Sequence, residues 1–554
     1  MAPAEVVARL TASGCHPLLA RIYAARGVTA PDELDDAFTR LHAPETMMNL
    51  EEAARLLADA IEKRAKLTIV ADYDADGATA CAVGMRALRA FGADVAYLVP
   101  NRFEYGYGLT PEIARLAHER LRPDVLITVD NGIASLEGVA EANRLGMRVL
   151  VTDHHLPGES LPDAWCIVNP NQRGCGFPSK HLAGVGVMFY LMLALRKELR
   201  TRGALTREIN MAALLDLVAL GTVADVVRLD ANNRVLVQQG VKRMRAGRTQ
   251  AGIAALFRAS GRDPSRAGAY DLGFVLGPRL NAAGRLDDMS LGIECLVTDD
   301  ANRALAIAMR LDELNRERRE IEVQMQDSAL AAIGEDVGDA CALALFDPEW
   351  HQGVVGIVAS RLKDRFHRPV IAFARGNAGE IKGSGRSIAG LHLRDALDLV
   401  TKRHPGLVVR FGGHAAAAGL TLRETDFAVF RSAWEDTVKS LVTAADLERQ
   451  IETDGSLPAG HATLAAGRAI AAAVWGQGFP EPRFFDGFEV VEQRVVGGRH
   501  MKLKVAREGR AFDAMLFGAC ETFPARIEAV YRLDVNEFNG TQSLQLVVQH
   551  WHEA

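Results

Sequence analysis

The acid-rich turn after the first apolar run constrains this sequence most. Asp72, Asp74 and Asp76 fall within five positions, directly after the apolar run Leu67 to Ala71, which predicts a buried strand. Residues Ala78 to Phe91, which follow, have helical composition. Carboxylates this close repel one another and ionise poorly unless a cation lies among them. The turn therefore predicts a site for a hard divalent metal ion. The alternative is an acidic turn in which Asp76 caps the next helix.

Two further strand-to-turn units have the same character. The run Val125 to Val129 ends in Asp130-Asn-Gly, and the run Arg148 to Thr152 ends in Asp153-His-His. Helical segments alternate with these runs, which predicts a parallel sheet. Ligands bind beyond the carboxyl ends of such strands, so we expect the three acidic turns to meet at one edge. Imidazole and carboxylate together suit Mn²⁺, Zn²⁺ or Fe²⁺ better than Ca²⁺, and a carboxylate-rich set with one or two histidines favours Mn²⁺ or Mg²⁺.

The three motifs, Asp-x-Asp-x-Asp-Gly, Asp-Asn-Gly and Asp-His-His, resemble in this order those of the DHH phosphoesterase superfamily. The segment Leu214 to Val227 is similar to a fourth motif of that superfamily, with Asp225 as the matching ligand and Asp216 as its alternative. The later chain narrows the resemblance to the RecJ family of single-strand-specific exonucleases. The resemblance covers nearly the whole sequence.

The resemblance implies hydrolysis of a phosphodiester with two divalent metal ions, Mn²⁺ being preferred and Mg²⁺ the second choice. The metal ligands that it implies are Asp72, Asp74, Asp76, Asp130, His154 and Asp225. Asp130 is expected to bridge the two ions. Asp74 would serve the first ion with it, whereas Asp76, His154 and Asp225 would serve the second.

One position departs from the superfamily pattern. Several members carry a histidine four residues before the equivalent of Asp74, where this chain has Val70. The first ion then has fewer protein ligands, and Asp72 or water is expected to complete its shell. The resemblance leaves His155 to stabilise the charge of the phosphorane or to protonate the leaving 3′ oxygen. Asp153 would orient a histidine.

Length and composition limit the class of protein. At 554 residues the chain is too long for one core and predicts roughly three or four domains. A hydrophobic fraction of 49% and a charged fraction of 24% are ordinary for a soluble globular protein. The seven cysteines are scattered without a Cys-x-x-Cys pair, which argues against a disulfide framework and a zinc ribbon. No signal segment opens the chain, and the most apolar helical run, Ala183 to Leu195, is too short to span a bilayer, so we expect a cytoplasmic protein.

We expect an α/β protein with a long bridging helix and a terminal barrel. The barrel is predicted from five runs between Phe488 and His550 that are rich in β-branched and aromatic residues. The expected parts are an N-terminal helical segment (1–49), a parallel-sheet DHH catalytic domain (50–298), a bridging helix (299–335), a second α/β domain of the DHHA1 type that binds substrate (336–453), and an OB-like barrel (454–554).

Two stretches of the first domain are candidates for contact with substrate. Arg102 and Tyr107 lie in a glycine-containing loop after a strand, where a guanidinium can hold phosphate and a ring can stack on a base; the alternative is that the rings of this loop pack on the domain. The stretch Leu276 to Arg285 lacks helix or strand periodicity and is read as a phosphate-binding turn. Its candidates are Arg279, then Arg285, with Asn281. The alternative for such arginines is a surface or salt-bridge position.

The second α/β domain and the barrel supply the remaining candidates. Ser384 and Arg386 lie among glycines, which let backbone amides approach an anion closely. His414 is a phosphate ligand or, alternatively, a residue that bonds to backbone in a tight turn. The net charge of −6 gives no support to a nucleic-acid partner, so a local basic surface must provide it. The basic run Arg494 to Arg510, which includes Lys502 and Lys504, is such a track for a single strand.

The favoured function is a single-stranded-DNA-specific 5′→3′ exonuclease that releases mononucleotides in DNA repair and recombination. The implied partners are single-stranded DNA, a RecQ-type helicase and a single-stranded-DNA-binding protein, and the exonuclease itself is expected to be a monomer. A phosphoesterase acting on short oligonucleotides or cyclic dinucleotides is the rival enzyme, which the long chain with its barrel disfavours. A non-catalytic DNA-binding scaffold is the rival of another class, but such relatives lose metal carboxylates and here all four motifs are filled.

Overall fold

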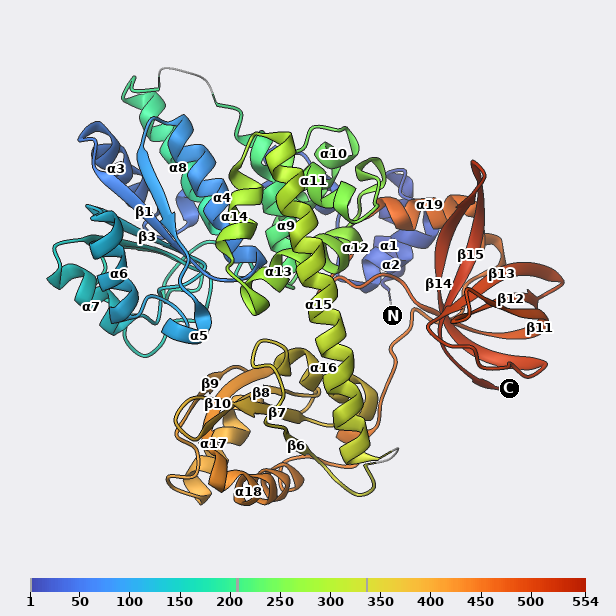
Figure 1. The fold of residues 1–554 in the computed structure, drawn as a ribbon. Coiled ribbons are helices and arrows are strands. Elements are labelled where there is room, and N and C mark those ends of the chain that lie inside the picture. The colour runs from blue at the N-terminus through green and yellow to red at the C-terminus, as the bar shows by residue number, and fades with distance from the viewer. Residues whose placement is uncertain (1, 206–208, 335–336) are drawn as a thin grey trace. The chain divides into compact units, whose positions relative to one another are not determined.

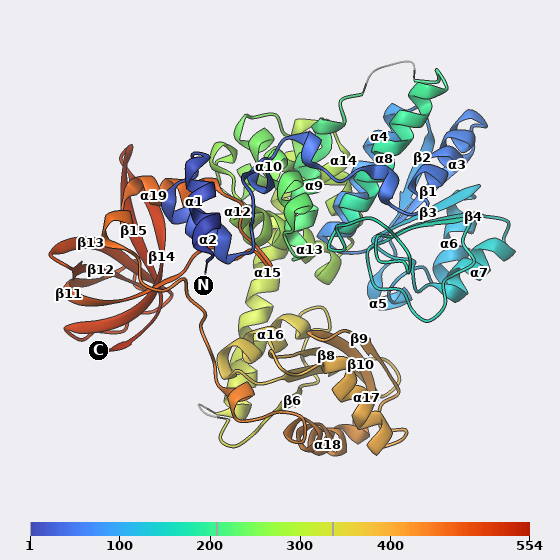
Figure 2. The same cartoon turned by 180° about the vertical axis from the view of Figure 1, so that it is seen from behind.

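The computed structural model of the protein describes residues 2–205, 209–334 and 337–554 (Figures 1 and 2). The chain divides into two compact units. The first consists of Met1–Gly284, Asp288–Asp312 and Glu452–Ala554, and the second of Arg285–Asp287 and Glu313–Ile451. Within the described residues, no helix combines the length and the apolar character that crossing a membrane requires.

The first unit is built on a sheet of five parallel strands in the order β2-β1-β3-β4-β5. The strands are β1 (Lys66–Ala71), β2 (Asp94–Leu98), β3 (Val125–Val129), β4 (Arg148–Thr152) and β5 (Cys166–Val168). Ala71 pairs with Val129, and Val129 pairs with Thr152, so β1, β3 and β4 end at the same level. The predicted parallel sheet is confirmed, and the three acidic turns leave the same edge.

Helices cover both faces of this sheet (Figure 1). On one face α6 and α7 share a core cluster with the strands, in which Ile113 and Val139 lie with Leu126 and Val149. On the other face α4 packs against α8. The helices of this region are α3 (Leu50–Glu62), α4 (Ala75–Ala90), α5 (Arg102–Tyr105), α6 (Pro111–Leu121), α7 (Leu136–Arg144), α8 (Gly184–Thr201) and α9 (Leu215–Ala224), with the 3₁₀ turn η4 (Met211–Leu214).

A layer of helices follows α9. It includes the stretch 276–285, for which the sequence predicted a turn. It consists of α10 (Ala231–Arg245), α11 (Ala251–Ala259), η5 (Pro264–Arg266), α12 (Ala269–Asp271), the π-helical turn η6 (Leu272–Leu276), α13 (Gly277–Leu286) and α14 (Ser290–Val297). The stretch Leu276 to Arg285 was predicted as a turn, which is wrong because it is helical. Its glycines serve close packing instead: a Cβ on Gly284 would lie 1.9 Å from the Tyr73 carbonyl oxygen. Pro278 lies where the π-helical turn η6 continues directly into α13.

The N-terminal helices hold the segment that leads into the barrel. Arg26 forms a two-pronged ion pair with Asp454, with N–O distances of 2.6 and 2.9 Å. Tyr23 stacks on both Trp475 and Phe479. The elements are α1 (Ala4–Ala12), α2 (Pro17–Ala25), η1 (Pro31–Leu34), η2 (Phe38–Arg40), η3 (Pro44–Thr46), η9 (Ala459–His461) and α19 (Leu464–Ala472).

The barrel is closed by five strands in the order β11-β12-β13-β15-β14, which confirms the predicted five-stranded barrel. Its strands are β11 (Phe484–Val496), β12 (His500–Arg507), β13 (Arg510–Phe517), β14 (Arg526–Phe538) and β15 (Thr541–Glu553). All pairs are antiparallel except β13 with β15.

The long helix α15 (Ala301–Ile333) contributes residues to both units. It occupies the position of the predicted bridging helix. The second unit contains a mixed sheet in the order β6-β7-β8-β10-β9, which confirms a second α/β domain. Its core includes Phe373, Phe430 and Trp434. The elements are β6 (Leu343–Phe346), α16 (Val355–Phe366), β7 (Val370–Arg375), β8 (Glu380–Arg386), α17 (Leu393–Arg403), β9 (Arg410–Gly413), β10 (Ala417–Arg423), η7 (Glu424–Asp426), α18 (Phe427–Lys439) and η8 (Ala445–Leu447).

One arginine of the basic run has a structural position in the barrel. Arg507 pairs with the buried carboxylate of Asp486 at 2.7 Å and also donates to the Leu457 carbonyl at 3.0 Å. Asp486 further accepts hydrogen bonds from the hydroxyls of Ser456 and Tyr531. Arg507 is therefore committed to this network, and the expectation that the whole run faces a DNA strand is wrong at this position.

We predict that Arg507→Ala destabilises the barrel by about 3–5 kcal/mol, because it leaves the Asp486 carboxylate buried without its counter-charge. Calorimetric unfolding of the full chain measures the loss. Lys504→Ala, on the same strand but exposed, is the matched control and should change stability by less than about 0.5 kcal/mol. Equal effects of the two substitutions would contradict this role for Arg507.

Candidate metal centre

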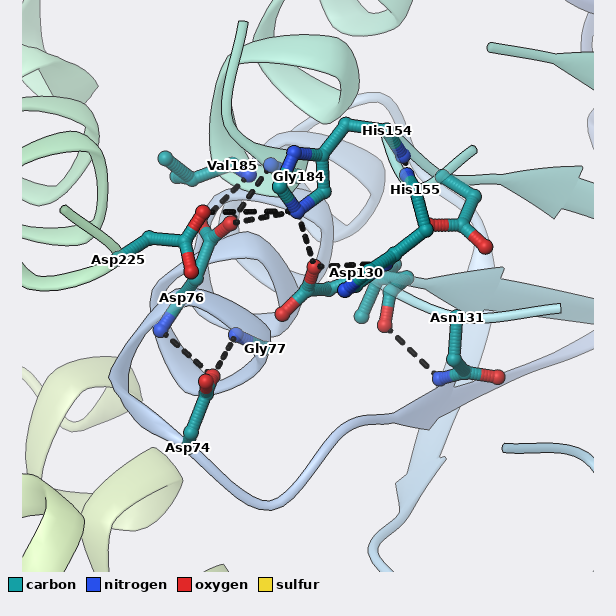
Figure 3. Close-up of polar contacts among 12 residues, drawn as sticks. Asp74, Asp76, Gly77, Asp130, Asn131, His154, His155, Gly184, Val185 and Asp225 are labelled. Carbon is teal, nitrogen blue, oxygen red and sulfur yellow. Dashed lines mark hydrogen bonds and ion pairs between the residues drawn. The ribbon is translucent and has the colours of Figure 1, made fainter. Parts of the chain in front are cut away.

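The acidic turns beyond β1, β3 and β4 meet the end of α9 in one cluster (Figure 3). Three groups of side chains each bring their ligand atoms within 4.8 Å of one another. The groups are Asp72 with Asp74 and Asp130, Asp76 with His154 and Asp225, and Asp130 with His154 and His155. Because the groups share Asp130 and His154, they form one continuous cluster, as the strand ends predict.

The first turn is held from both sides by backbone groups. Asp74 is the N-cap of α4, since its Oδ1 accepts hydrogen bonds from the Asp76 and Gly77 amides at 3.0 Å. The alternative in which Asp76 is the cap is therefore wrong. The Asp76 carboxylate instead accepts the amides of Gly184 and Val185, at 2.6 and 2.8 Å, at the start of α8. The N-terminus of a helix favours a negative charge at this place.

The second turn places Asp130 in an unusual backbone conformation. Its φ is +62°, in the left-handed region that aspartate tolerates better than most residues. The Asn131 side chain donates to the Val129 and Val70 carbonyls and ties the turn to two strands. A Cβ on Gly184 would lie 2.7 Å from the Asp130 Cβ, so α8 can approach the turn this closely only at a glycine.

His154 Nε2 points to three carboxylates (Figure 3). It lies 3.0 Å from Asp130 Oδ1, 3.5 Å from Asp225 Oδ2 and 3.9 Å from Asp76 Oδ2. Asp216, the alternative to Asp225, accepts the amides of Leu217 and Gln250 instead. The structure thus brings Asp225 to the cluster, whereas Asp216 lies at the other end of α9 and bonds to Gln250.

Asp153 orients the third turn. Its Oδ1 accepts the backbone amides of His154 and His155 and the His155 Nδ1 at 2.8 Å, while its Oδ2 accepts the amide of Ile133. The carboxylate therefore fixes the His155 ring, whose side chain is 45% exposed. The hydroxyl of Tyr107 lies 3.3 Å from His155 Nε2. His155 is the most accessible member of the cluster and stands where a substrate can reach it.

The electrostatics of the cluster call for positive charge. Burial and then the charges of Asp76 and Asp74 raise the pKa of Asp130 well above its usual range, and the pKa of Asp225 rises for the same reasons. Burial and then Asp74 raise the pKa of Asp76 to about 7. Burial followed by the charge of His155 lowers the pKa of His154 to about 4, which favours the neutral imidazole that ligates metals. Burial lowers the pKa of His155 as well, but its bond to Asp153 outweighs this and raises it to about 9.

The residues present fit a cation. Asp130 Oδ1 and His154 Nε2 are both buried and make no hydrogen bond of good geometry to any residue that the structure describes. Buried polar atoms of this kind are costly unless something satisfies them. A carboxylate oxygen and a neutral imidazole nitrogen 3.0 Å apart have the chemistry of two ligands of one divalent ion.

Around the cluster, the predicted substrate residues of the first unit fall into different environments. Tyr107 lies beside His155, whereas the side chain of Arg102 is outside the residues that the structure describes. Asn281 accepts the Ala75 amide at 2.7 Å and so holds the first turn of α4. Arg279 is buried and pairs with Asp312 at 2.7 Å, in addition to donating to the Val275 carbonyl. The salt-bridge alternative therefore describes Arg279, and a phosphate-binding turn does not.

The other candidates lie in the second unit and in the barrel. Arg386 donates to the Ser384 hydroxyl at 3.1 Å and to the Gly385 carbonyl, and burial lowers its pKa. Arg285 donates to the Gly353 carbonyl. His414 accepts the Ala416 amide in a tight turn, as its alternative supposes. Candidates Lys502 and Lys504 lie on β12, where Lys502 is 3.8 Å from Asp513.

Sequence reasoning missed the backbone amides of Gly184 and Val185. The signal was present, because Gly184 and Gly186 open an apolar helix, and glycine at a helix N-terminus permits close approach of an anion. The anion that these amides bind is a carboxylate of the chain itself.

We predict that Gly184→Ala destabilises the first unit by a few kcal/mol, about 1–3, because the new methyl group meets the Cβ of Asp130, whose backbone is constrained. Thermal unfolding checks this. Gly158→Ala is the control in the same unit: its Cβ would meet nothing closer than the Ser160 carbonyl oxygen, at 3.8 Å. If Gly158→Ala were as harmful as Gly184→Ala, the close approach at Asp130 would not be limiting.

Three family models match consecutive parts of the chain. The DHH family N-terminal domain matches residues 66–222, the DHHA1 domain matches 338–440, and the RecJ OB domain matches 453–550. Among solved structures, RecJ from Thermus thermophilus in complex with Mn²⁺ has a TM-score of 0.85 at 30% identity, over 100% of this chain and 78% of that chain. The same protein in complex with Mg²⁺ gives 0.79 at 29% identity, over 100% and 77%.

Full-length relatives carry one name. The single-stranded-DNA-specific exonuclease RecJ of Dickeya dadantii is 50% identical over 96% of this chain and 95% of its own length. The protein of that name from Escherichia coli is 48% identical over the same shares of the two chains. With both matches extending through the metal cluster, the second α/β domain and the barrel, this chain belongs to the RecJ family of single-stranded-DNA-specific exonucleases.

Proposed function

We propose that the chain is a metal-dependent exonuclease that degrades single-stranded DNA from the 5′ end and releases mononucleotides by two-metal phosphodiester hydrolysis, in DNA repair and recombination. The convergence of five carboxylates, three of them buried, and His154 in one cluster carries the proposal. Its relatives are named for this activity, and a solved relative holds Mn²⁺ or Mg²⁺. Mn²⁺ is the preferred ion here, with Mg²⁺ second, because imidazole joins the carboxylates.

The proposed ligands follow from which atoms lie together. Asp130 belongs to two of the three candidate groups and is the shared ligand. Asp74 and Asp72 would complete one ion, and Asp76, His154 and Asp225 the other. Asp74 and Asp76 already accept backbone amides, which fixes their carboxylates without using every lone pair. Asp72 lies in the first group, in agreement with its expected role where Val70 replaces a histidine.

A bound pair of divalent ions would supply a water of lowered pKa and neutralise the charge of the phosphate. The protein supplies the remaining chemistry. His155, held by Asp153 and partly exposed, is bonded through Nδ1 to that carboxylate, which favours the ring that carries a proton. It is therefore suited to donate that proton to the leaving 3′ oxygen, or to stabilise negative charge on the phosphate. Asp153 binds Nδ1 of His155, so the other ring nitrogen, Nε2, is the one left to donate the proton.

The second unit supplies a proposed site for the terminal phosphate. The side chain of Arg386 is half-buried, and none of the residues that the structure describes gives it a carboxylate partner. A Cβ on Gly356, at the start of α16, would lie 2.8 Å from the Ser384 hydroxyl and 3.0 Å from an Arg386 nitrogen. The first turn of a helix thus packs directly over a hydroxyl donor and a half-buried cation, a combination that favours an anion.

The proposed cellular setting follows from the substrate. The barrel, with Lys502 and Lys504 on β12, would hold the strand away from the reaction centre. A RecQ-type helicase would supply the single strand and a single-stranded-DNA-binding protein would present it. The exonuclease would act as a monomer in the cytoplasm, where its DNA substrate lies.

We predict that Asp130→Asn reduces cleavage of single-stranded DNA by more than about 100-fold, because it removes the charge that both ions share. Asparagine also tolerates the left-handed backbone at this position, so the fold should survive. Release of nucleotides from 5′-labelled strands with Mn²⁺ measures activity, and calorimetric titration with Mn²⁺ measures ion binding. Asp94→Asn, at the exposed start of β2, is the control. A variant that keeps more than a hundredth of the wild-type rate would exclude a shared Asp130.

We also predict that Arg386→Ala loses most of the preference for 5′-phosphorylated over 5′-hydroxyl ends. A charge-assisted hydrogen bond is worth about 1.5–3 kcal/mol, so the ratio of kcat/KM values should fall by about 10- to 150-fold. Arg375→Ala is the control and should leave the ratio unchanged, because Arg375 is an exposed residue of the neighbouring strand β7 and is paired with Glu424 of η7. An unaltered ratio in Arg386→Ala would move the phosphate site elsewhere.

A further inference from the structure

Two large aromatic side chains of the first unit are exposed side by side. Tyr270 is 61% exposed and Phe274 is 67% exposed. Their ring centroids lie 5.1 Å apart with an interplanar angle of 26°, so the rings are stacked. The pair presents ring surface to solvent at a cost in hydrophobic free energy, and the mechanism described above does not use it.

The segment that carries the pair contacts the end of α9, where Asp225 follows as the C-cap. Tyr270 belongs to α12 and Phe274 to the π-helical turn η6. A Cβ on Gly273 would lie 3.3 Å from Val223 Cγ1, and one on Gly277 would lie 3.0 Å from the Ala224 Cβ. The turn that carries Phe274 and the residue after it therefore pack on the two residues that precede Asp225. π-helical turns are rare and are frequent at functional sites.

The other end of the same segment reaches the barrel. Arg266, four residues before Tyr270, lies 3.5 Å from Glu537 near the end of β14. Residues 266–277 thus form a continuous contact path within the first unit, from the barrel to the helix that presents Asp225. A strand held by the barrel and cut at the metal cluster has to cross the surface of this unit, and this path joins the two.

Charge on the segment suits a phosphate backbone. Arg258, Arg262 and Arg266 are all exposed and precede the aromatic pair; Arg262 lies 4.0 Å from Asp271 and Arg266 lies 3.5 Å from Glu537, both at the surface. The neighbouring acids are engaged locally: Asp263 accepts bonds from Ser265, and Asp271 accepts the Gly268 amide. Cations for phosphates beside rings for bases are the two elements of single-strand recognition.

We infer that Tyr270 and Phe274 form a base-stacking platform for single-stranded DNA on its way from the barrel to the metal cluster. The inference rests on the proposed function, since it takes the substrate to be a single strand. Stacking on a ring needs a base with a free face, which a duplex does not offer. The platform would therefore also help to select single strands over duplex DNA.

The test begins with binding in the presence of a chelator, so that no hydrolysis occurs. We expect the double variant Tyr270→Ala, Phe274→Ala to bind a long single strand about tenfold more weakly or worse, because stacked bases are lost. With Mn²⁺ its KM should rise while kcat at saturating DNA is unchanged, because the metal ligands are untouched. Phe38→Ala, which removes a 43% exposed ring elsewhere on the first unit, is the matched control and should bind as wild type does. Tyr270→Phe keeps the ring and should also bind normally.

A second measurement assigns the contact to bases and is made first on the wild-type chain. Single abasic sites are moved along the strand, and wild-type binding should weaken at one or two positions, a dependence that the double variant lacks. Photo-crosslinking with 5-iodouracil at those positions should capture Tyr270 or Phe274. Wild-type affinity in the double variant, or crosslinks that never include either ring, would overturn the inference. A wild-type chain that binds with this abasic dependence but hydrolyses nothing with Mn²⁺ would instead refute the exonuclease and leave the platform standing.

Discussion

Burial of like charges at one edge of a sheet governs this structure. Asp130 and Asp225 are forced together where strand ends and a helix end converge, and burial makes their ionised forms costly. Two kinds of group oppose that cost: the amides at the start of α8, which bond to Asp76, and the cation that the arrangement is suited to bind. The glycine at 184 and the left-handed backbone at 130 both exist because the helix must come this close.

The parallel sheet and the metal edge could be predicted because both rest on local patterns. An apolar run followed by an acidic turn predicts both a strand and a ligand from neighbouring residues alone. The strands then pair in parallel, which brings such turns together at one edge of the sheet. The same holds for the barrel, whose strands are rich in β-branched and aromatic residues. Asp225 was separable from Asp216 only by structure, because both lie on one helical motif and only the packing of α9 decides which faces His154.

The predictions that were wrong share a physical reason. Glycine and arginine in the stretch 276–285 suggested a turn for an anion, yet Gly284 is needed because α13 touches the Tyr73 carbonyl, and Arg279 serves a buried pair with Asp312. Arg507 similarly neutralises Asp486 inside the barrel. When the acidic partner of a basic residue is distant in the sequence, the sequence alone gives no sign that the two are paired. Composition therefore overstated the number of cations available to DNA.

The ties of the first acidic turn to later parts of the chain bear on how the protein is made. Asp76 bonds to an amide 108 residues further on, and the Ala75 amide bonds to Asn281, 206 residues further on. During synthesis from the N-terminus, all four metal motifs leave the ribosome before α13 does. A nascent chain that ends between α9 and α13 carries every metal ligand but lacks the contact that shapes the first turn. The first turn thus gains its contact with Asn281 only after α13 has been made, later than every metal ligand.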